Sequence, residues 1–229
     1  MCSSDLANGI NAVAIAANSN AIGVNSMAIG VDSIANQDNG VAVGTLSKAT
    51  GIGALAFGAN ANASANDTMA FGVNSIASGV NATAIGRSAL ASSANALALG
   101  LFSQATGNVA VAIGMNSQAT ANESMAIGAY ANASYNNALA MGTNAQATAV
   151  NAMALGSQSY ANTTDAFAAG LGAKATGVNS LALGMYSNAN STNAFAAGSF
   201  AAALNENALA YGTRAYANGA NRSEEHTSE

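Results

Sequence analysis

Apolar and polar positions repeat every 14 residues along almost the whole chain. Residues 179–192 read NSLALGMYSNANST, and the same frame occurs as DAFAAGLGAKATGV at 165–178 and as NAFAAGSFAAALNE at 193–206. A 14-residue unit that ends in glycine fits fourteen times without insertion or deletion. Repeats of fixed length are typical of solenoids. The sequence therefore predicts one repeat domain over residues 7–221.

Two short stretches of each unit alternate with period two. When the glycine is numbered 14, positions 10–13 read small, apolar, alanine, apolar, as at residues 180–183. Positions 3–6 read small, variable, alanine, polar, as at residues 187–190. Period two predicts strands, and a helical repeat would need a longer unit. We expect an all-β fold, a parallel β-solenoid of about fourteen coils with two short strands per coil.

The turns between these strands have their own residues. An invariant glycine indicates a backbone with positive φ, or a close approach that leaves no room for a side chain. Position nine is asparagine in nine of the fourteen units; asparagine tolerates left-handed backbone and can stack its amide on the next coil. The predicted turn glycines are Gly30, Gly44, Gly58, Gly72, Gly86, Gly100, Gly114, Gly128, Gly142, Gly156, Gly170, Gly184, Gly198 and Gly212.

Positions 11 and 13 form an apolar stripe on the outside of the coil. Positions 3, 5, 10 and 12 hold small residues and are predicted to face one another inside it. An outward apolar stripe of this length predicts burial against other copies of the chain, most safely in a closed ring; the pattern leaves the number of copies open. The interface residues are Met27, Ile29, Val41, Val43, Leu55, Phe57, Met69, Phe71, Leu97, Leu99, Val111, Ile113, Met125, Ile127, Leu139, Met141, Met153, Leu155, Phe167, Leu181, Leu183, Phe195, Leu209 and Tyr211.

Charge and composition exclude several classes of function. Residues 7–221 hold four basic and six acidic side chains, a net charge of 4 − 6 = −2. That balance gives neither the basic footprint of a nucleic-acid binder nor the cationic face of a lipid-surface helix, and no apolar run is long enough to insert into a membrane. The same residues contain no cysteine or histidine, so we expect no enzyme, no metal site and no cofactor.

The two ends of the chain do not follow the repeat. They read MCSSDL at 1–6 and RSEEHTSE at 222–229, and back-translated they resemble the two orientations of one common sequencing adapter. Both ends are therefore predicted to be adapter artefacts and not parts of the repeat domain. These ends contain Cys2 and His226, so neither residue is expected to act in catalysis, metal binding or redox sensing. On this interpretation the chain is a piece of a longer protein.

The repeat resembles the head repeat of YadA-like trimeric autotransporter adhesins. NSMAIG (25–30) and NSLALG (179–184) are close to the family motif, and ESMAIG (123–128), NALALG (95–100) and NAMALG (151–156) are looser copies. The resemblance implies a left-handed β-roll, a parallel homotrimer, and a position outside a Gram-negative cell, tethered to the outer membrane through a C-terminal anchor absent from this sequence. It also implies adhesion to host matrix or cells, and bacterial autoagglutination.

The resemblance also suggests ligand residues. NSVAIG-type motifs bind collagen in some members, which points to Asn25, Ser26, Asn179 and Ser180 here, although the valine of the motif is replaced at both sites. The other interpretation is that these motifs only build the trimer interface.

Four aromatic residues share position two, just after the invariant glycine. They could line a ligand surface or cover the rim of the trimer interface, and they are Phe102, Tyr130, Tyr186 and Phe200.

Two alternatives to an adhesin remain open. The same repeat could serve as a rigid spacer in a phage tail fibre or another trimeric fibre. An ice-binding solenoid would need a regular threonine ladder, whereas position six mixes Asn, Ser, Thr and Leu.

Overall fold

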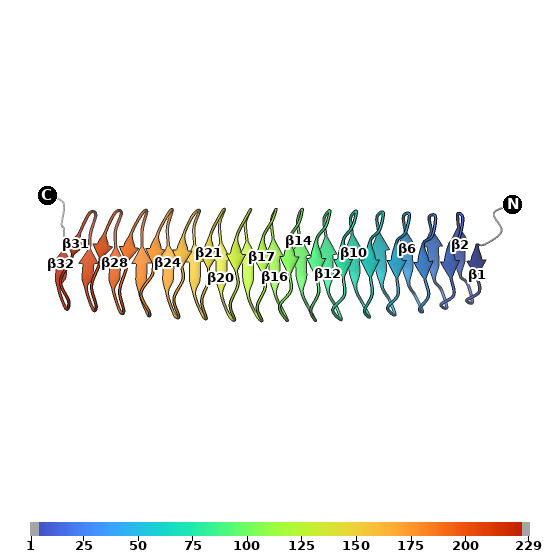
Figure 1. Ribbon diagram of the computed structural model, residues 1–229, viewed down its shortest axis with the longest axis horizontal. Coiled ribbons are helices and arrows are strands. Elements are labelled where there is room, and N and C mark those ends of the chain that lie inside the picture. The colour runs from blue at the N-terminus through green and yellow to red at the C-terminus, as the bar shows by residue number, and fades with distance from the viewer. Residues whose placement is uncertain (1–4, 226–229) are drawn as a thin grey trace. The chain divides into compact units, whose positions relative to one another are not determined.

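A computed structural model describes residues 5–225, and every regular element among them is a β-strand. The chain divides into two compact units, one ending at Asn116 and the other beginning at Ser117. Within each unit, short strands alternate with turns, and consecutive coils lie side by side (Figure 1).

The first unit contains eight two-residue strands and eight three-residue strands. The two-residue strands are β1 (Leu6–Ala7), β3 (Asn20–Ala21), β5 (Ile34–Ala35), β7 (Lys48–Ala49), β9 (Asn62–Ala63), β11 (Ile76–Ala77), β13 (Leu90–Ala91) and β15 (Gln104–Ala105). The three-residue strands are β2 (Val13–Ile15), β4 (Met27–Ile29), β6 (Val41–Val43), β8 (Leu55–Phe57), β10 (Met69–Phe71), β12 (Thr83–Ile85), β14 (Leu97–Leu99) and β16 (Val111–Ile113).

The second unit repeats this arrangement. Its two-residue strands are β17 (Gln118–Ala119), β19 (Asn132–Ala133), β21 (Gln146–Ala147), β23 (Tyr160–Ala161), β25 (Lys174–Ala175), β27 (Asn188–Ala189), β29 (Ala202–Ala203) and β31 (Tyr216–Ala217). Its three-residue strands are β18 (Met125–Ile127), β20 (Leu139–Met141), β22 (Met153–Leu155), β24 (Phe167–Ala169), β26 (Leu181–Leu183), β28 (Phe195–Ala197), β30 (Leu209–Tyr211) and β32 (Ser223–Glu225).

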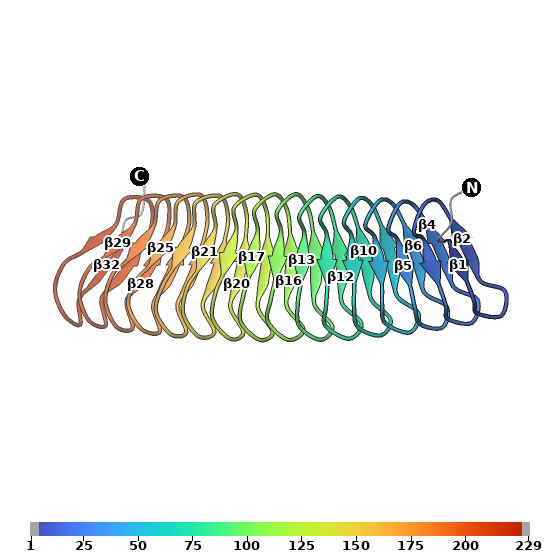
Figure 2. The ribbon, with the colours of Figure 1, turned by 45° about the vertical axis from the view of Figure 1, so that its right-hand side comes forward.

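Strands of each kind pair in parallel with the strands one coil before and after, in a register of 14 residues. Leu55 pairs with Met69 in the first unit, and Leu139 pairs with Met153 in the second. Each unit therefore has two parallel sheets, one of each strand length (Figure 2). The prediction of an all-β parallel solenoid with two strands per coil is confirmed.

The number of coils slightly exceeds the prediction. The fourteen coils expected from the sequence correspond to β3 to β30, and the described residues add one coil before them and one after. In the last coil, Ser223 pairs with Leu209, and Arg222 forms an ion pair with Glu224. Part of residues 222–229, which the sequence predicted to be an adapter artefact, therefore forms strand β32 in the structure.

Small side chains fill the interior of the coils, as the pattern predicts. Alanines at positions 5 and 12, such as Ala133 and Ala140, are 0% exposed. The largest fully buried side chains are one threonine, Thr68, and eleven serines. Several of these serines donate to a backbone carbonyl three residues earlier; for example, the Ser159 hydroxyl lies 2.8 Å from the Gly156 oxygen. The two sheets can lie close together because nothing larger separates them.

The turns explain the invariant glycine in two ways. From Gly30 to Gly212, these glycines have φ between 110° and 141°. A Cβ added at most of them would lie only 2.3–2.7 Å from the carbonyl oxygen of the glycine one coil further on. Side chains are therefore excluded both by the backbone conformation and by the neighbouring coil.

Two further turn positions have left-handed backbone. Position nine does so, as its asparagines indicate, with φ of 56° at Asn25 and 55° at Asn193. Position two also has left-handed backbone, although the residue type there varies widely: φ is 59° at Leu46 and 56° at Phe102. Each coil thus turns at two left-handed residues, on opposite sides of its strands.

Candidate functional site

The apolar stripe lies on the outer face of the three-residue strands. In each of these strands from β4 to β30 the middle residue is a buried alanine, so the first and third side chains point away from the interior. The predicted interface residues fall equally on the two units, twelve in each. Within a unit, pairing in register lines them up along the outer face of one sheet. The structure thus brings these residues together within each unit.

Many stripe side chains are accessible in the single chain. In the second unit Met141 is 43% exposed, and Met125 and Met153 are each 37% exposed. In the first unit the rings of Phe57 and Phe71 stack with centroids 4.7 Å apart and planes 13° apart. These side chains form an ordered apolar surface that nothing in the chain covers among the described residues.

The two best copies of the family motif begin in a turn and continue through a three-residue strand, β4 in one copy and β26 in the other. Asn25 and Asn179 have left-handed backbone, with φ of 56° and 55°. Ser26 and Ser180 are each only 1% exposed, and the Ser180 hydroxyl accepts a hydrogen bond from the Gly177 amide at 3.2 Å. Of these four candidate ligand residues, the two serines therefore face the interior, and direct contact with a partner would fall to the asparagines.

Asparagines at position nine form hydrogen-bonded ladders on the second turn, which lies between each two-residue strand and the next three-residue strand and includes positions eight and nine. The Asn193 amide donates to Asn207 at 3.0 Å, and Asn207 donates to Asn221 at 3.0 Å. An acid can end such a ladder, since Asn151 donates to the Asp165 carboxylate at 2.9 Å. The amide stacking expected at position nine is present, and it ties each coil to the next at this edge.

The position-two aromatics lie at the turn that follows the invariant glycine. Phe102, Tyr130, Tyr186 and Phe200 are 42–49% exposed. The rings of Tyr186 and Phe200 stack, with centroids 5.4 Å apart. The sequence identified these residues, but it did not reveal the stacking or the left-handed backbone that presents them.

Side chains that could ligate a metal ion do not cluster in the part of the chain that the structure describes. Residues 5–225 contain no group of three or more His, Cys, Asp or Glu side chains that could hold a metal ion. Over the same range, none of the structure is a helix long and apolar enough to cross a bilayer. Cys2 and His226 lie outside the described residues.

These features define a class of protein: a parallel β-solenoid with an interior of alanine and serine, glycine turns and an outer apolar stripe. A comparison with protein families then identifies it more closely. The chain belongs to the family of the YadA head domain repeat, whose two-copy model matches residues 21–47, 49–75, 63–89, 77–103, 91–117, 105–131, 119–145, 133–159, 147–173, 161–187 and 175–201.

A solved structure is also similar. It is the crystal structure of the collagen-binding domain of the Yersinia adhesin YadA, with 19% identity, 96% of this chain and 84% of that chain covered, and a TM-score of 0.22. A comparison with curated proteins found no match. The assignment to a family therefore rests on the match to the family model. That match supports a general role in adhesion for this domain.

Proposed function

We propose that residues 7–221 act as one head domain of a bacterial surface adhesin, assembled from three parallel copies. In this proposal the assembled head stands outside the cell, tethered to the outer membrane through an anchor beyond this sequence. It attaches the bacterium to host extracellular matrix or to cells, and contacts between heads cause bacteria to agglutinate. The observation that carries the proposal is the apolar stripe, which a single chain leaves in contact with water.

The stripe is large enough to drive association. If burial removed about 50 Å² of apolar surface from each of the twelve stripe residues in one unit, the gain would be about 15 kcal/mol at roughly 25 cal/mol per Å². The loss of translational and rotational freedom costs about 4–15 kcal/mol per association. The second unit carries a stripe of the same number of residues. Three copies in a ring cover every stripe and leave none open for fibre growth.

The first test is the molar mass of the whole chain in solution, measured by light scattering after size exclusion. The chain has a mass of 22.1 kDa, so a trimer has 3 × 22.1 = 66.3 kDa. Leu139→Asp, on the stripe strand β20, should reduce the mass to that of one chain, because three buried carboxylates would meet in the interface. Gln146→Asp, on the exposed strand β21, is the matched control and should leave the trimer intact. A folded wild-type monomer would remove the basis of the proposal.

The second test is attachment. Beads that carry the trimer should adhere to surfaces coated with matrix proteins, and collagen is the first ligand to try. The Asn25→Ala and Asn179→Ala pair tests the motif positions that face outward. Loss of adhesion with the trimer retained would support a role for these motifs in binding.

A spacer in a phage tail fibre or other trimeric fibre is the second candidate function. It is favoured by the burial of Ser26 and Ser180, since motif residues that face the interior build the coil and cannot reach a partner. A stable trimer that adheres to no matrix protein or cell would favour the spacer over the adhesin. An ice-binding role would require thermal hysteresis activity, which we expect to be absent because the position-six ladder is mixed.

A further inference from the structure

The two arginines of residues 7–221, Arg87 and Arg214, both lie at the first turn, which comprises positions one and two. Each lies one coil away from an exposed phenylalanine. The Phe102 amide donates to the Arg87 carbonyl oxygen at 3.0 Å. The Arg214 amide donates to the carbonyl of Ser199, the residue before Phe200, at 2.8 Å. An arginine and an exposed phenylalanine thus lie on neighbouring coils at the first turn once in each unit.

Exposed apolar side chains surround each of these pairs. We name the two groups arginine–aromatic patches. In the first unit the patch consists of Arg87, Leu101 (38% exposed), Phe102 (42%) and Met115 (39%). In the second unit it consists of Leu171 (41% exposed), Met185 (41%), Tyr186 (47%), Phe200 (48%) and Arg214. Each patch spans consecutive coils, because the Tyr186 amide donates to Leu171 and the Phe200 amide donates to Met185, both at 2.8 Å.

The second patch is pre-organised. The rings of Tyr186 and Phe200 stack 5.4 Å apart. On its other side Tyr186 covers Gly172, where an added Cβ would lie 2.6 Å from two atoms of the tyrosine ring. The Tyr186 ring therefore packs between Gly172 and Phe200, the position-two residues one coil before and one coil after it. Methionine and aromatic side chains are enriched at protein interfaces, so this surface favours a protein partner.

The charges at the first turn are uncompensated. Within residues 5–225, neither Arg87 nor Arg214 forms an ion pair or a side-chain hydrogen bond, and both are exposed. Five of the six acids of the repeat region lie instead at the second turn, at positions eight or nine: Asp38, Asp67, Glu123, Asp165 and Glu206. The exception, Asp32, accepts a hydrogen bond from Asn18 at 2.9 Å.

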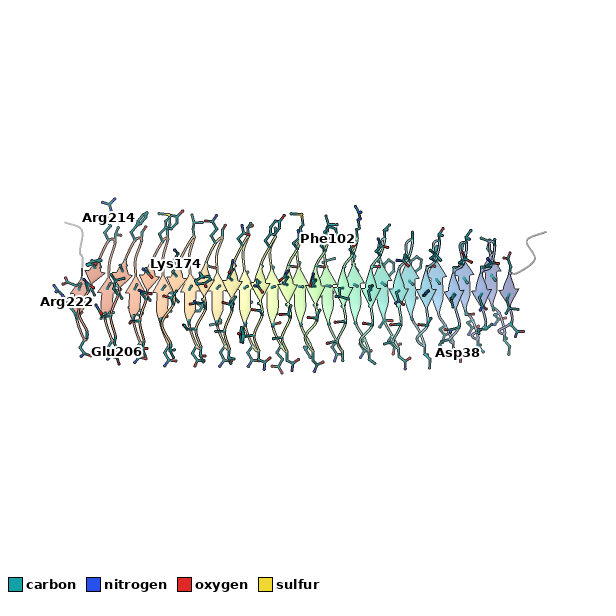
Figure 3. All side chains as sticks on the ribbon, viewed as in Figure 1. Asp38, Phe102, Lys174, Glu206, Arg214 and Arg222 are labelled. Carbon is teal, nitrogen blue, oxygen red and sulfur yellow. The ribbon has the colours of Figure 1, made fainter. Side chains whose placement is uncertain are left out.

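The side chains of each unit make this separation visible. Phe102 and Asp38 project from opposite edges of the first unit, and Arg214 and Glu206 project from opposite edges of the second (Figure 3). Each patch therefore carries one positive charge beside apolar and aromatic surface, and an acidic group on the partner would complement it.

We propose that the arginine–aromatic patches bind an acidic peptide segment of a partner protein, with large apolar side chains between its carboxylates. Arg, Tyr, Phe and Met are the residues enriched in the buried centres of protein interfaces, and Arg and Tyr dominate their energetic hot spots. The proposal rests on the adhesin function proposed above and specifies the chemistry of its partner.

The test uses the full chain and a fluorescein-labelled peptide, EEFEELEE, with fluorescence anisotropy as the readout. We expect saturable binding that weakens as salt is added, and no binding of KKFKKLKK or of EEGEEGEE. Phe102→Ala combined with Phe200→Ala should weaken binding about tenfold or more, the loss typical of interface hot spots. Arg87→Gln combined with Arg214→Gln should weaken it similarly and flatten the salt dependence.

The matched control is Tyr130→Ala. Tyr130 has the same position in its coil and is 49% exposed, but its neighbours at position two are asparagines. Binding by this variant should stay within twofold of wild type. The proposal is overturned if wild type does not bind EEFEELEE, if it binds KKFKKLKK equally well, or if Tyr130→Ala weakens binding as much as the phenylalanine pair. Binding of a sialylated oligosaccharide in place of the peptide would overturn it in favour of a glycan.

These outcomes are distinct from a failure of the adhesin proposal. That proposal fails if the wild-type chain is a monomer or does not attach to matrix or cells. A trimer that attaches but ignores the acidic peptide would retain the adhesin and remove only the patch assignment.

Discussion

Replacing Gly142 by alanine would test whether the coil spacing requires a glycine after each three-residue strand. Gly142 has φ 134°. An added Cβ would lie 2.5 Å from both the carbonyl carbon and the carbonyl oxygen of Gly156, one coil further on, and 2.9 Å from the Ser157 nitrogen. All three contacts are with backbone, so no side-chain rotation can relieve them.

The expected loss of stability follows from two contributions. Holding a residue other than glycine in a sparsely populated region of positive φ costs about 1–3 kcal/mol. The coils must also separate near Gly156, whose amide donates to the Met141 oxygen at 2.7 Å, and losing that bond costs about 1 kcal/mol. Together they give about 2–4 kcal/mol, a large share of the roughly 5–15 kcal/mol that stabilises a typical domain.

Urea denaturation followed by far-ultraviolet circular dichroism would measure this loss as a lower midpoint. Gly219→Ala is the control, because its added Cβ would lie 3.4 Å from the Arg222 side chain, an ordinary contact, and should change stability by less than about 0.5 kcal/mol. One alanine does occupy the position equivalent to Gly142. It is Ala16, in the first described coil, and its φ of 100° lies outside the range of 110–141° that the glycines adopt. Equal midpoints for Gly142→Ala and wild type would refute the argument from coil spacing.

Three further substitutions test other parts of the coil by the same denaturation assay. Gly53→Asn should stabilise the chain by about 0.5 kcal/mol, because asparagine tolerates the φ of 66° there and restricts the unfolded chain, while the flexible Asp67 carboxylate, 2.8 Å from the added Cβ, rotates away; a lower midpoint would contradict this. Ala140→Leu should destabilise by about 1–3 kcal/mol or more, since Ala140 is 0% exposed between two close sheets, and an unchanged midpoint would mean that the interior has room to spare. Asn193→Ala should cost about 1–2 kcal/mol through its left-handed backbone and the lost 3.0 Å bond to Asn207. Asn193→Gly should recover the backbone part of that cost, and equal losses for the two variants would assign the whole effect to the ladder.

Much of this fold could be read from the sequence because every coil repeats the same local rules. Alternation with period two identifies strands wherever one face is buried, and the small residues around Ala140 identify which face that is. The invariant glycines signal a special backbone position, and the structure adds that both positive φ and a close neighbouring carbonyl require them. The asparagines at position nine likewise indicate left-handed backbone, since few other residues adopt it at low cost.

The left-handed backbone at position two could not be predicted from the sequence in the same way. It is left-handed in almost every coil, yet it holds Leu46, Phe102 and Tyr186 as well as asparagine. The backbone cost of about 1 kcal/mol is offset there by a hydrogen bond to the previous coil, such as the one from the Phe102 amide to the Arg87 oxygen. A composition that varies from coil to coil conceals a conformation that stays the same.

The sequence by itself determined the period, the parallel strands, the interior of small residues and the outward stripe. Only the tertiary structure decided which side chains of neighbouring coils meet: the stacking of Tyr186 on Phe200, the burial of Ser180 in its motif, and the separation of Arg214 from Glu206 at opposite edges. The physical reason is that periodicity reports how each residue faces its own coil. Contacts between residues 14 apart depend on the stacking register, which hydrogen bonds between coils fix in three dimensions.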